Sequence, residues 1–201
     1  MPKYVDPEKR KTAIADATMR IIADIGLDGL TIRAIAKELG GSLTLVTHYF
    51  ASREDVLADL SGRLISEWKH QIEDREVGLV DPLARLYSFL TWNLSNTEKR
   101  RTEERARFQL LGALNQAPVL QPMFEDWDHY LRGVFRDRLE QLTPPSELEV
   151  MIDSLRSLTA GIVLMTREHD WSDDRQHAAL NKSLQMMGLL HEAATEATKW
   201  K

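Results

Sequence analysis

Apolar residues recur three or four positions apart along almost the whole chain, which is the spacing of one face of a helix. Runs in which apolar and polar residues alternate between hairpin turns, as in strands, are absent. This periodicity predicts an all-α fold with about nine helices. The expected helices cover about residues 6–25, 31–39, 43–50, 52–77, 81–94, 98–115, 123–142, 146–167 and 180–190.

Capping residues mark several of the expected helix starts. Thr31 and Ser42 each precede a short apolar stripe, where a side-chain oxygen can accept from a free backbone N–H. The segments Ser52-Arg53-Glu54-Asp55 and Ser146-x-x-Glu149 resemble capping boxes, in which two residues satisfy each other's backbone. We therefore expect helices to begin at these four positions.

The composition is that of a globular protein, with 43% apolar and 28% charged residues among 201. The absence of cysteine excludes disulfides, thiol nucleophiles and iron–sulfur clusters, and it fits a reducing cytoplasm. The N-terminus lacks the apolar core of a signal peptide, and no segment has the roughly 18 apolar residues of a membrane span. We expect a cytoplasmic protein with no membrane partner.

The charge is distributed unevenly along the chain. The net charge is −5, which by itself argues mildly against a nucleic-acid partner. Residues 1–57 contain eight basic and eight acidic side chains, so the acidic excess lies entirely in the remainder. The N-terminal part therefore differs in charge from the rest, which fits a division into domains at 1–52 and 53–201.

Residues 31–50 form two short helical segments joined by a Gly-Gly-Ser turn, the arrangement of a helix-turn-helix. In such a unit the second helix enters the major groove of DNA and the first crosses the backbone. Val46 and Phe50 share one face of the second segment, so we expect them to pack against the first. The pattern alone also allows a plain helical hairpin.

Eight residues of this segment are candidates for contact with double-stranded DNA. Leu43, Thr44 and Thr47 are expected to meet base edges, where hydroxyls bond and leucine contacts a thymine methyl. Side chains and helix N-termini nearer the backbone are expected to contact phosphate oxygens. The residues expected near phosphates are Thr31, Ser42, His48, Tyr49 and Arg53.

The sequences TIRAIAKELGGS at 31–42, VTHYF at 46–50 and SRE at 52–54 closely resemble the DNA-binding domain of TetR-type repressors. The resemblance covers about residues 8–60 and is greatest for the betaine-pathway repressor branch, with no match evident beyond residue 60. It implies a homodimer with an N-terminal three-helix DNA-reading domain. It further implies a C-terminal helical domain that binds a small molecule and dimerises through its last two helices.

The sequence departs from that family at the turn and at the recognition segment. Gly41 stands where a Val-like residue usually closes the helix junction, which makes the unit more costly to order. Leu43 replaces a residue that is often polar or basic, and Thr44 one that is often glycine. These departures predict modest base specificity and a contribution from DNA shape.

Aromatic residues on the central helices have two interpretations. They are first of all the core that a bundle of this size needs. Around a cavity they would suit an apolar or cationic effector, because a cation is attracted to ring faces. The candidate effector-binding residues are Trp68, Trp92, Phe108, Trp127 and Tyr130.

The last two helices carry broad apolar surfaces, as expected for helices that bury two faces. The resemblance implies that they form a four-helix contact in the homodimer. The candidate dimerisation residues are Leu155, Leu158, Ile162, Met165, Leu184 and Met187.

No catalytic, metal or cofactor site is predicted. The chain has no Gly-rich phosphate loop, no nucleophile elbow and no Walker lysine, so we do not expect an enzyme. The cluster Glu168-His169-Asp170 lacks a second ligand arm. The sequence therefore predicts a repressor that an effector releases from a palindromic operator, through a tilt of the helix that begins at Ser52. The alternative is a helical ligand-binding or protein-interaction module that no longer reads DNA.

Overall fold

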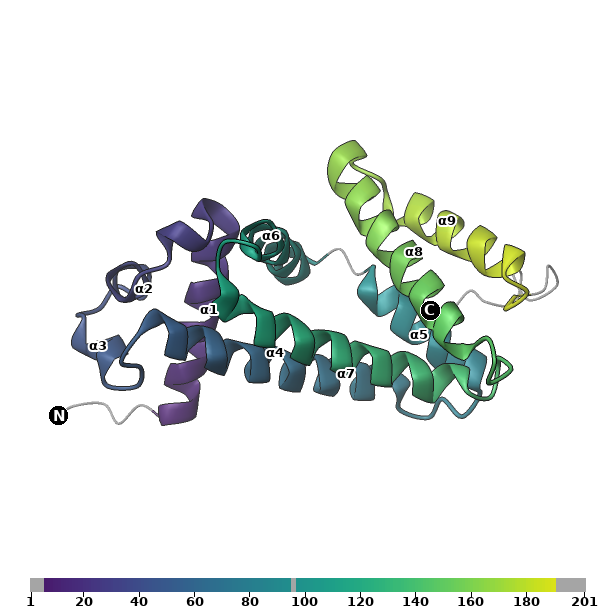
Figure 1. The fold of residues 1–201 in the computed structure, drawn as a ribbon, viewed down its shortest axis with the longest axis horizontal. Coiled ribbons are helices and arrows are strands. Elements are labelled where there is room, and N and C mark those ends of the chain that lie inside the picture. Colours follow the sequence, from purple (N-terminus) through teal and green to yellow (C-terminus); the bar gives the residue numbers. More distant parts are fainter. Residues whose placement is uncertain (1–5, 95–96, 191–201) are drawn as a thin grey trace. The chain divides into compact units, whose positions relative to one another are not determined.

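A computed structural model describes residues 6–94 and 97–190, and within these ranges every regular element is helical. This confirms the all-α prediction (Figure 1). Two 3₁₀ turns lie at Leu27–Gly29 and Pro118–Leu120. The nine α-helices of the described residues are α1 (Pro7–Ile25), α2 (Ile32–Glu38), α3 (Thr44–Thr47), α4 (Arg53–Glu76), α5 (Pro82–Asn93), α6 (Glu98–Ala113), α7 (Gln121–Leu139), α8 (Leu148–His169) and α9 (Asp173–Met186).

The chain divides into two compact units. Unit 1 comprises residues 1–70 and 97–130, and unit 2 comprises residues 71–96 and 131–201. Helices α4 and α7 each contribute residues to both units. These units reflect how closely residues pack and not what they do. The predicted functional boundary between residues 52 and 53 therefore stays a prediction.

In unit 1 the N-terminal helices pack against one another through buried apolar side chains. Ile14, Ile22 and Ile35 are 1%, 0% and 0% exposed, and they bring the apolar stripes of α1 and α2 inward. Helix α6 also packs on α1. A buried face of this kind, rather than intrinsic propensity, stabilises helices as short as α2.

Local capping sets several helix starts as predicted. The Thr31 hydroxyl accepts from the Ala34 backbone N–H at 3.0 Å and opens α2. At the start of α4, Ser52 Oγ accepts from the Asp55 N–H at 3.1 Å, while the Asp55 carboxylate accepts from the Ser52 N–H at 3.0 Å. This reciprocal pair confirms the capping box and satisfies two backbone donors.

Ser42 does not cap α3, and the predicted helix over 43–50 is only one turn long. Leu43 is the N-cap residue and has no side-chain capping bond. The Ser42 hydroxyl is instead hydrogen-bonded to the Thr44 hydroxyl at 2.8 Å. The first turn of α3 forms through backbone bonds, such as the Val46 N–H donating to the Leu43 carbonyl at 3.0 Å.

Ser146 likewise does not cap α8. The helix begins at Leu148, and its N-cap residue Glu147 makes no side-chain capping bond. The expected partner, Glu149, accepts hydrogen bonds from Arg132 and Arg136 on α7. The Glu149 carboxylate is therefore ion-paired with Arg132 and Arg136 and does not form the expected capping box.

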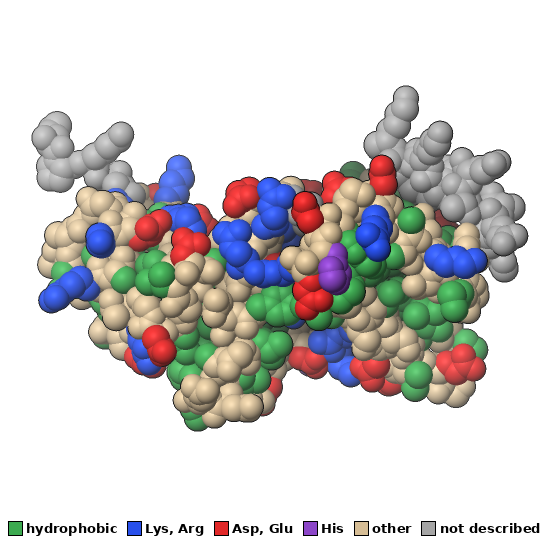
Figure 2. Space-filling view, turned by 90° about the horizontal axis from the view of Figure 1, so that it is seen from above, with side chains coloured by type: hydrophobic (Ala, Val, Ile, Leu, Met, Phe, Trp, Pro, Cys, Tyr) green, Lys and Arg blue, Asp and Glu red, His purple; other side chains and the backbone are tan. Residues whose placement is uncertain are grey.

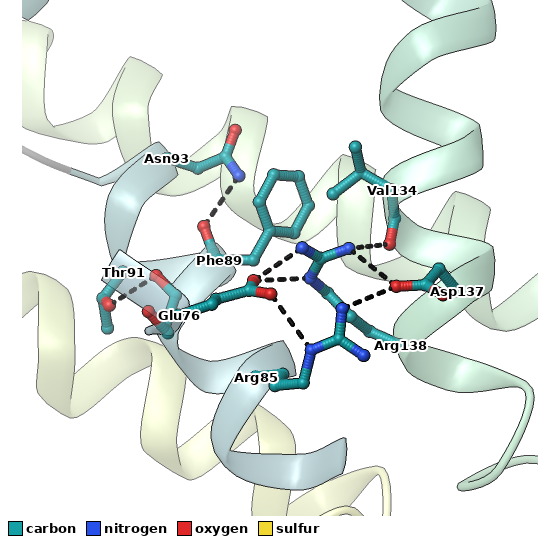
Figure 3. A network of polar contacts seen from close by, with 9 residues as sticks. Glu76, Arg85, Phe89, Thr91, Asn93, Val134, Asp137 and Arg138 are labelled. Carbon is teal, nitrogen blue, oxygen red and sulfur yellow. Dashed lines mark hydrogen bonds and ion pairs between the residues drawn. The ribbon is translucent and has the colours of Figure 1, made fainter. Parts of the chain in front are cut away.

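Unit 2 is crossed by a network of charged side chains between α4, α5 and α7 (Figure 3). Glu76 accepts from both Arg85 and Arg138, and Asp137 accepts from both of these arginines as well. The Arg138 guanidinium also lies 5.4 Å from the ring centroid of Phe89. The two buried charges, Glu76 and Arg138, are tolerated in the interior because each is paired, while Arg85 and Asp137 lie nearer the surface.

None of the helices in the described part of the chain is both long enough and apolar enough to cross a membrane.

Candidate nucleic-acid interface

The turn between α2 and α3 has the geometry of a Schellman motif. Gly40 lies in the left-handed region with φ +64°. Its N–H donates to the Lys37 carbonyl at 2.9 Å, and the Gly41 N–H donates to the Ala36 carbonyl at 3.0 Å. Glycine is favoured at such a position because it has no Cβ to clash there. The turn therefore ends α2 sharply and directs the chain into α3.

The recognition segment separates buried from exposed side chains. Val46 is 0% exposed and Phe50 is 6% exposed, which confirms that these two residues anchor the segment to the core. Leu43 is 48% exposed, and Thr44 and Thr47 are exposed beside it. A large apolar side chain that stays in water next to two hydroxyls is suited to a groove that offers methyl groups and polar edges.

Two candidate phosphate ligands lie directly after α3. His48 is exposed and Tyr49 is half-buried, and their rings meet edge to face with centroids 4.9 Å apart. The half-buried Tyr49 ring therefore restricts the position of the His48 imidazole. Both side chains can donate hydrogen bonds to phosphate oxygens.

The remaining three candidates have intramolecular partners. Thr31 and Ser42 use their hydroxyls in the contacts described above, although a hydroxyl that accepts one bond can still donate another. Arg53 Nε donates to the Glu54 carboxylate at 2.9 Å, and Glu54 lies in the first turn of α4. A phosphate would therefore share Arg53 with this carboxylate.

Helix α2 carries two further basic side chains that the sequence interpretation did not assign. Arg33 and Lys37 are exposed and lie one turn apart, and neither has an ion pair within the described residues. The acidic residue next to them, Glu38, is paired with Arg20 of α1 at 2.8 Å. Their i, i+4 spacing could have identified them from sequence, because it places both side chains on one face of α2. In a helix-turn-helix bound to DNA, the first helix crosses the phosphate backbone.

Acidic and basic side chains are interspersed over the face of the molecule drawn in Figure 2. This agrees with the equal numbers of basic and acidic residues in the first 57 positions. Lys37 of α2 is an exposed cation close in sequence to α3.

Residues 14–60 match the family model described as bacterial regulatory proteins of the tetR family. Residues 14–60 form a TetR-family domain. The match includes the Schellman turn, all of α3 and the Ser52 capping box of this TetR domain.

Curated relatives of the TetR domain are transcriptional regulators. HTH-type transcriptional regulator PksA of Bacillus subtilis is 48% identical over 58 residues, which are 29% of this chain and 28% of PksA. HTH-type transcriptional regulator BetI of Burkholderia ambifaria is 24% identical over 143 residues, 71% of this chain and 66% of BetI. The chain thus spans less than two thirds of each relative, and the BetI similarity continues beyond residue 60, contrary to the expectation from sequence.

Solved structures show the TetR fold over most of the chain. A TetR-family regulator from Rhodococcus superposes with TM-score 0.77 at 16% identity, covering 89% of this chain and 98% of that one. A regulator from Saccharomonospora viridis in complex with choline gives 0.73 at 19% identity, covering 89% and 96%. The multidrug binding protein EbrR complexed with ethidium gives 0.60 at 24% identity, covering 92% and 100%. The arrangement expected from the TetR resemblance, an N-terminal helix-turn-helix followed by a helical domain, is confirmed.

The candidate effector residues do not lie in one unit. In unit 1 the buried rings of Trp68 and Trp127 have centroids 5.6 Å apart, and Phe108 and Tyr130 are half-buried. Trp92 belongs to unit 2, where it stacks on Phe89 and donates to Gln71 at 2.9 Å. These contacts show that the three tryptophans pack in the core, and their role as effector ligands stays a prediction.

The candidate dimerisation residues fall into two sets. Leu155, Ile162 and Leu184 are 0%, 4% and 0% exposed within a single chain. The other three, Leu158, Met165 and Met187, are half-buried. Sequence alone could not separate these two sets, because the separation depends on burial. Burial also identifies large exposed apolar side chains on α8 and α9 that the sequence interpretation did not include among the dimerisation candidates. The exposed ones are Val150, Leu164 and Met186.

Proposed function

We propose that this protein is a DNA-binding transcriptional regulator, a repressor that a small-molecule effector releases from its operator. The observation that carries the proposal is the two-sided recognition segment of the TetR domain. Val46 and Phe50 hold it to the core, while Leu43 and Thr47 project into solvent. The function of the curated relatives, which are transcriptional regulators, supports it. The proposal includes no catalytic activity.

Base readout is assigned to Leu43, Thr44 and Thr47. Phosphate contacts are assigned to exposed donors around them, because such contacts fix the register of the protein on DNA without reading sequence. These donors are Thr31, Arg33, Lys37, Ser42, His48, Tyr49 and Arg53. DNA reading is placed in residues 1–52, and effector binding and dimerisation in residues 53–201. Since the operator lies in the bacterial cytoplasm, the protein is proposed to act there.

The proposed assembly is a homodimer, because a palindromic operator requires two recognition segments related by a two-fold axis. Val150 and Leu164 lie on the same helix and are 68% and 40% exposed, and Met186 of α9 is 79% exposed. Side chains of this size and exposure suit a contact with a second copy. The half-buried Leu158, Met165 and Met187 would extend that contact.

The proposed effector is a small apolar or cationic molecule. Two proteins with similar folds, the Saccharomonospora viridis regulator and EbrR, are in complex with choline and ethidium, which are both cations. In this chain, the rings of Trp68 and Trp127 offer faces that attract a cation. The indole N–H of Trp127 is buried and has no hydrogen-bond partner among the described residues, so it could donate to a polar effector group.

Effector release follows from linkage between two binding equilibria. Helix α4 begins at the Ser52 cap of the DNA-reading domain and carries Trp68 at its centre. An effector that favours a different tilt of α4 would change the separation of the two recognition segments in the dimer. Operator affinity would then fall by the coupling free energy, typically about 1–3 kcal/mol.

The experiment that tests this function is selection of genomic DNA. The full chain is mixed with sheared DNA from its own source at near-physiological salt, and the retained fragments are sequenced. Enrichment of a palindrome supports the proposal. A folded protein that enriches no sequence favours the alternative, a helical ligand-binding or protein-interaction module that no longer reads DNA. The salt dependence gives a second criterion. For a DNA-binding protein, the logarithm of the affinity for DNA must fall linearly with the logarithm of the salt concentration.

A further inference from the structure

A cavity of about 320 Å³ lies within unit 1, between α1, α4 and α6. This volume is at the lower end of the range of about 300–1,000 Å³ that is typical of small-molecule sites. Part of its wall is apolar, because Ala15, Met19, Leu60 and Leu64 are buried and line it. Thr12, Thr102 and charged side chains from the same three helices form the rest of the wall.

The basic side chains in this wall are already neutralised. Each of the three forms an ion pair with a carboxylate, so none of them is available as the main partner of an anionic ligand. The pairs are Arg20 with Glu38, Arg63 with Glu8 and Lys99 with Glu67, at N···O distances of 2.8, 2.9 and 2.9 Å. The wall therefore does not favour an anion.

Glu103 of α6 contributes a carboxylate to the wall that is only half satisfied. The residue is 6% exposed, and its Oε2 accepts from Arg100 at 2.8 Å. Its other oxygen, Oε1, is buried and has no hydrogen-bond partner in the part of the chain that the structure describes. A buried carboxylate oxygen without a donor is unfavourable. Because Glu103 lines the cavity, a ligand bound there can supply the missing donor.

A second carboxylate adds to the negative charge of the wall. Asp16 of α1 lines the cavity and has no ion pair among the described residues. This negative charge affects the pKa of Lys99. Partial burial by itself lowers the pKa of Lys99, but its hydrogen bond to Glu67 and the charges of Glu67, Glu103 and Asp16 outweigh burial and raise this pKa. The surroundings of Lys99 thus favour positive charge.

We propose that this cavity binds an amphipathic molecule that carries a protonated primary or secondary amine. The ammonium N–H donates to Glu103 Oε1, and Asp16 adds charge attraction at the more exposed side. The apolar body of the ligand contacts Met19 and Leu60. A quaternary ammonium satisfies the charge and leaves the unpaired oxygen without a donor, so the site discriminates against it.

The site offers a second route to regulation. Helix α1 is the first helix of the DNA-reading domain, and an amine bound here would bridge it to α4 and α6. By linkage, a ligand that prefers one arrangement of these helices changes operator affinity. Only this consequence rests on the proposed DNA-binding function, because amine binding itself can be measured without DNA.

The test uses hexylammonium as the probe, with the full chain labelled at its methionine methyl groups. A ligand with seven heavy atoms is expected to bind with Kd on the order of 1 mM. Saturable binding is followed by NMR, where the Met19 methyl signal reports the location. Hexyltrimethylammonium keeps the charge without the donor, and hexanol keeps a donor without the charge. Both are expected to bind at least about tenfold more weakly.

Three variants locate the site. Glu103→Gln and Asp16→Asn are expected to weaken hexylammonium binding, the first by about tenfold or more because it removes a charge-assisted bond. Asp16 is exposed, so its variant remains informative if Glu103→Gln impairs folding. Glu125→Gln is the matched control, because Glu125 is an exposed carboxylate of α7 that lies outside the cavity wall.

Loss of affinity in the two cavity variants, together with a shift of the Met19 methyl signal, supports the proposal. Equal binding of all three probes, an unshifted Met19 signal, or equal affinity in Asp16→Asn and Glu125→Gln overturns it. Operator binding is then measured with and without hexylammonium. Failure of the protein to bind DNA refutes the proposed function alone, since amine binding was established in the absence of DNA.

Discussion

Glu76 of α4 and Arg138 of α7 form a buried ion pair across 62 positions of sequence, with Arg138 Nε donating to Glu76 Oε1 at 2.7 Å (Figure 3). Their side chains are 8% and 7% exposed. Such a pair contributes little net stability by itself, because desolvation offsets the attraction. Removing Glu76 is different, since it leaves the buried Arg138 with the exposed Asp137 as its charged partner.

We therefore predict that Glu76→Gln destabilises the protein by about 3–5 kcal/mol, as is typical for breaking a buried pair. Arg85 and Arg138 both lose their charged acceptor on α4. The measurement is urea denaturation followed by circular dichroism. The control is Glu8→Gln, which removes the exposed partner of Arg63 and should change stability very little. Equal effects of the two variants would contradict the importance of burial.

The two adjacent glycines of the turn are predicted to respond oppositely to alanine. Gly40→Ala should destabilise the TetR domain by about 1–2 kcal/mol, because φ is +64° and alanine is strained there. Gly41→Ala should stabilise it by about 0.4–1 kcal/mol, since it restricts the unfolded chain.

At Gly41 the new methyl would lie 2.5 Å from Leu45 Cδ1, the end of a half-buried and flexible side chain that can move aside. Thermal unfolding of both variants measures the difference. Destabilisation by Gly41→Ala would show that Leu45 cannot move.

Thr47 and Lys37 are predicted to affect DNA binding in different ways. Thr47→Ala should cost about 1–3 kcal/mol on the selected operator and little on random DNA, because Thr47 is assigned to base readout in the proposed function. Lys37→Ala should weaken binding to both DNAs and reduce the salt slope by about 1, because Lys37 is assigned there to a phosphate contact.

Fluorescence anisotropy at several salt concentrations gives both quantities. The assignment of Thr47 to base readout fails if its variant loses the same affinity on operator and random DNA.

Leu164 and Leu155 lie on α8 and are predicted to act at different levels of structure. Leu164→Glu should disrupt the proposed homodimer and leave the protomer folded, because this side chain is 40% exposed. Leu155→Ala should destabilise the protomer itself by about 2–5 kcal/mol, because it removes a fully buried side chain. Light scattering and thermal unfolding separate the two effects. A Leu164→Glu protein that remains dimeric would exclude this face from the interface.

Tyr87 of α5 gives a prediction for alkaline pH. Burial raises the pKa of Tyr87 above its ordinary value of 10.0, against a smaller opposite effect of the hydrogen bond with Asn181. The folded state then holds the phenolic proton more tightly than the unfolded state. Its contribution to stability is complete below pH 10.0 and is lost as the pH rises through the folded-state pKa.

Tyr87→Phe should therefore make the decline of stability above pH 10.0 less steep. The comparison requires denaturation curves of both proteins at several alkaline pH values. An unchanged slope would mean that Tyr87 titrates alike in the folded and unfolded states.

The sequence by itself determined the features that depend on neighbours within about one turn of helix. Thr31 and Ser52 cap their helices through bonds to residues three positions ahead, so local pattern was sufficient to predict them. The apolar period also predicted that Val46 and Phe50 would be the buried face of the recognition segment. These interactions form wherever the local chain is helical, whatever surrounds it.

Tertiary structure decided the outcome wherever one side chain had partners distant in sequence. Ser146 and Glu149 match a capping box, but Arg132 and Arg136 on another helix take the carboxylate. Leu155 is one of the residues expected at a dimer contact from the apolar face of its helix and the TetR resemblance, and only packing shows that it is already enclosed within one chain.

The unpaired oxygen of Glu103 had no signal in sequence, because residues 98–107 mix acidic and basic side chains, a pattern that favours a solvated helix surface. Burial of that carboxylate depends on α1 covering α6, two helices far apart in sequence that helical periodicity cannot relate to each other. Spacing along the chain specifies which faces are apolar, whereas the choice of partner for each face and each charge is made only when distant helices pack.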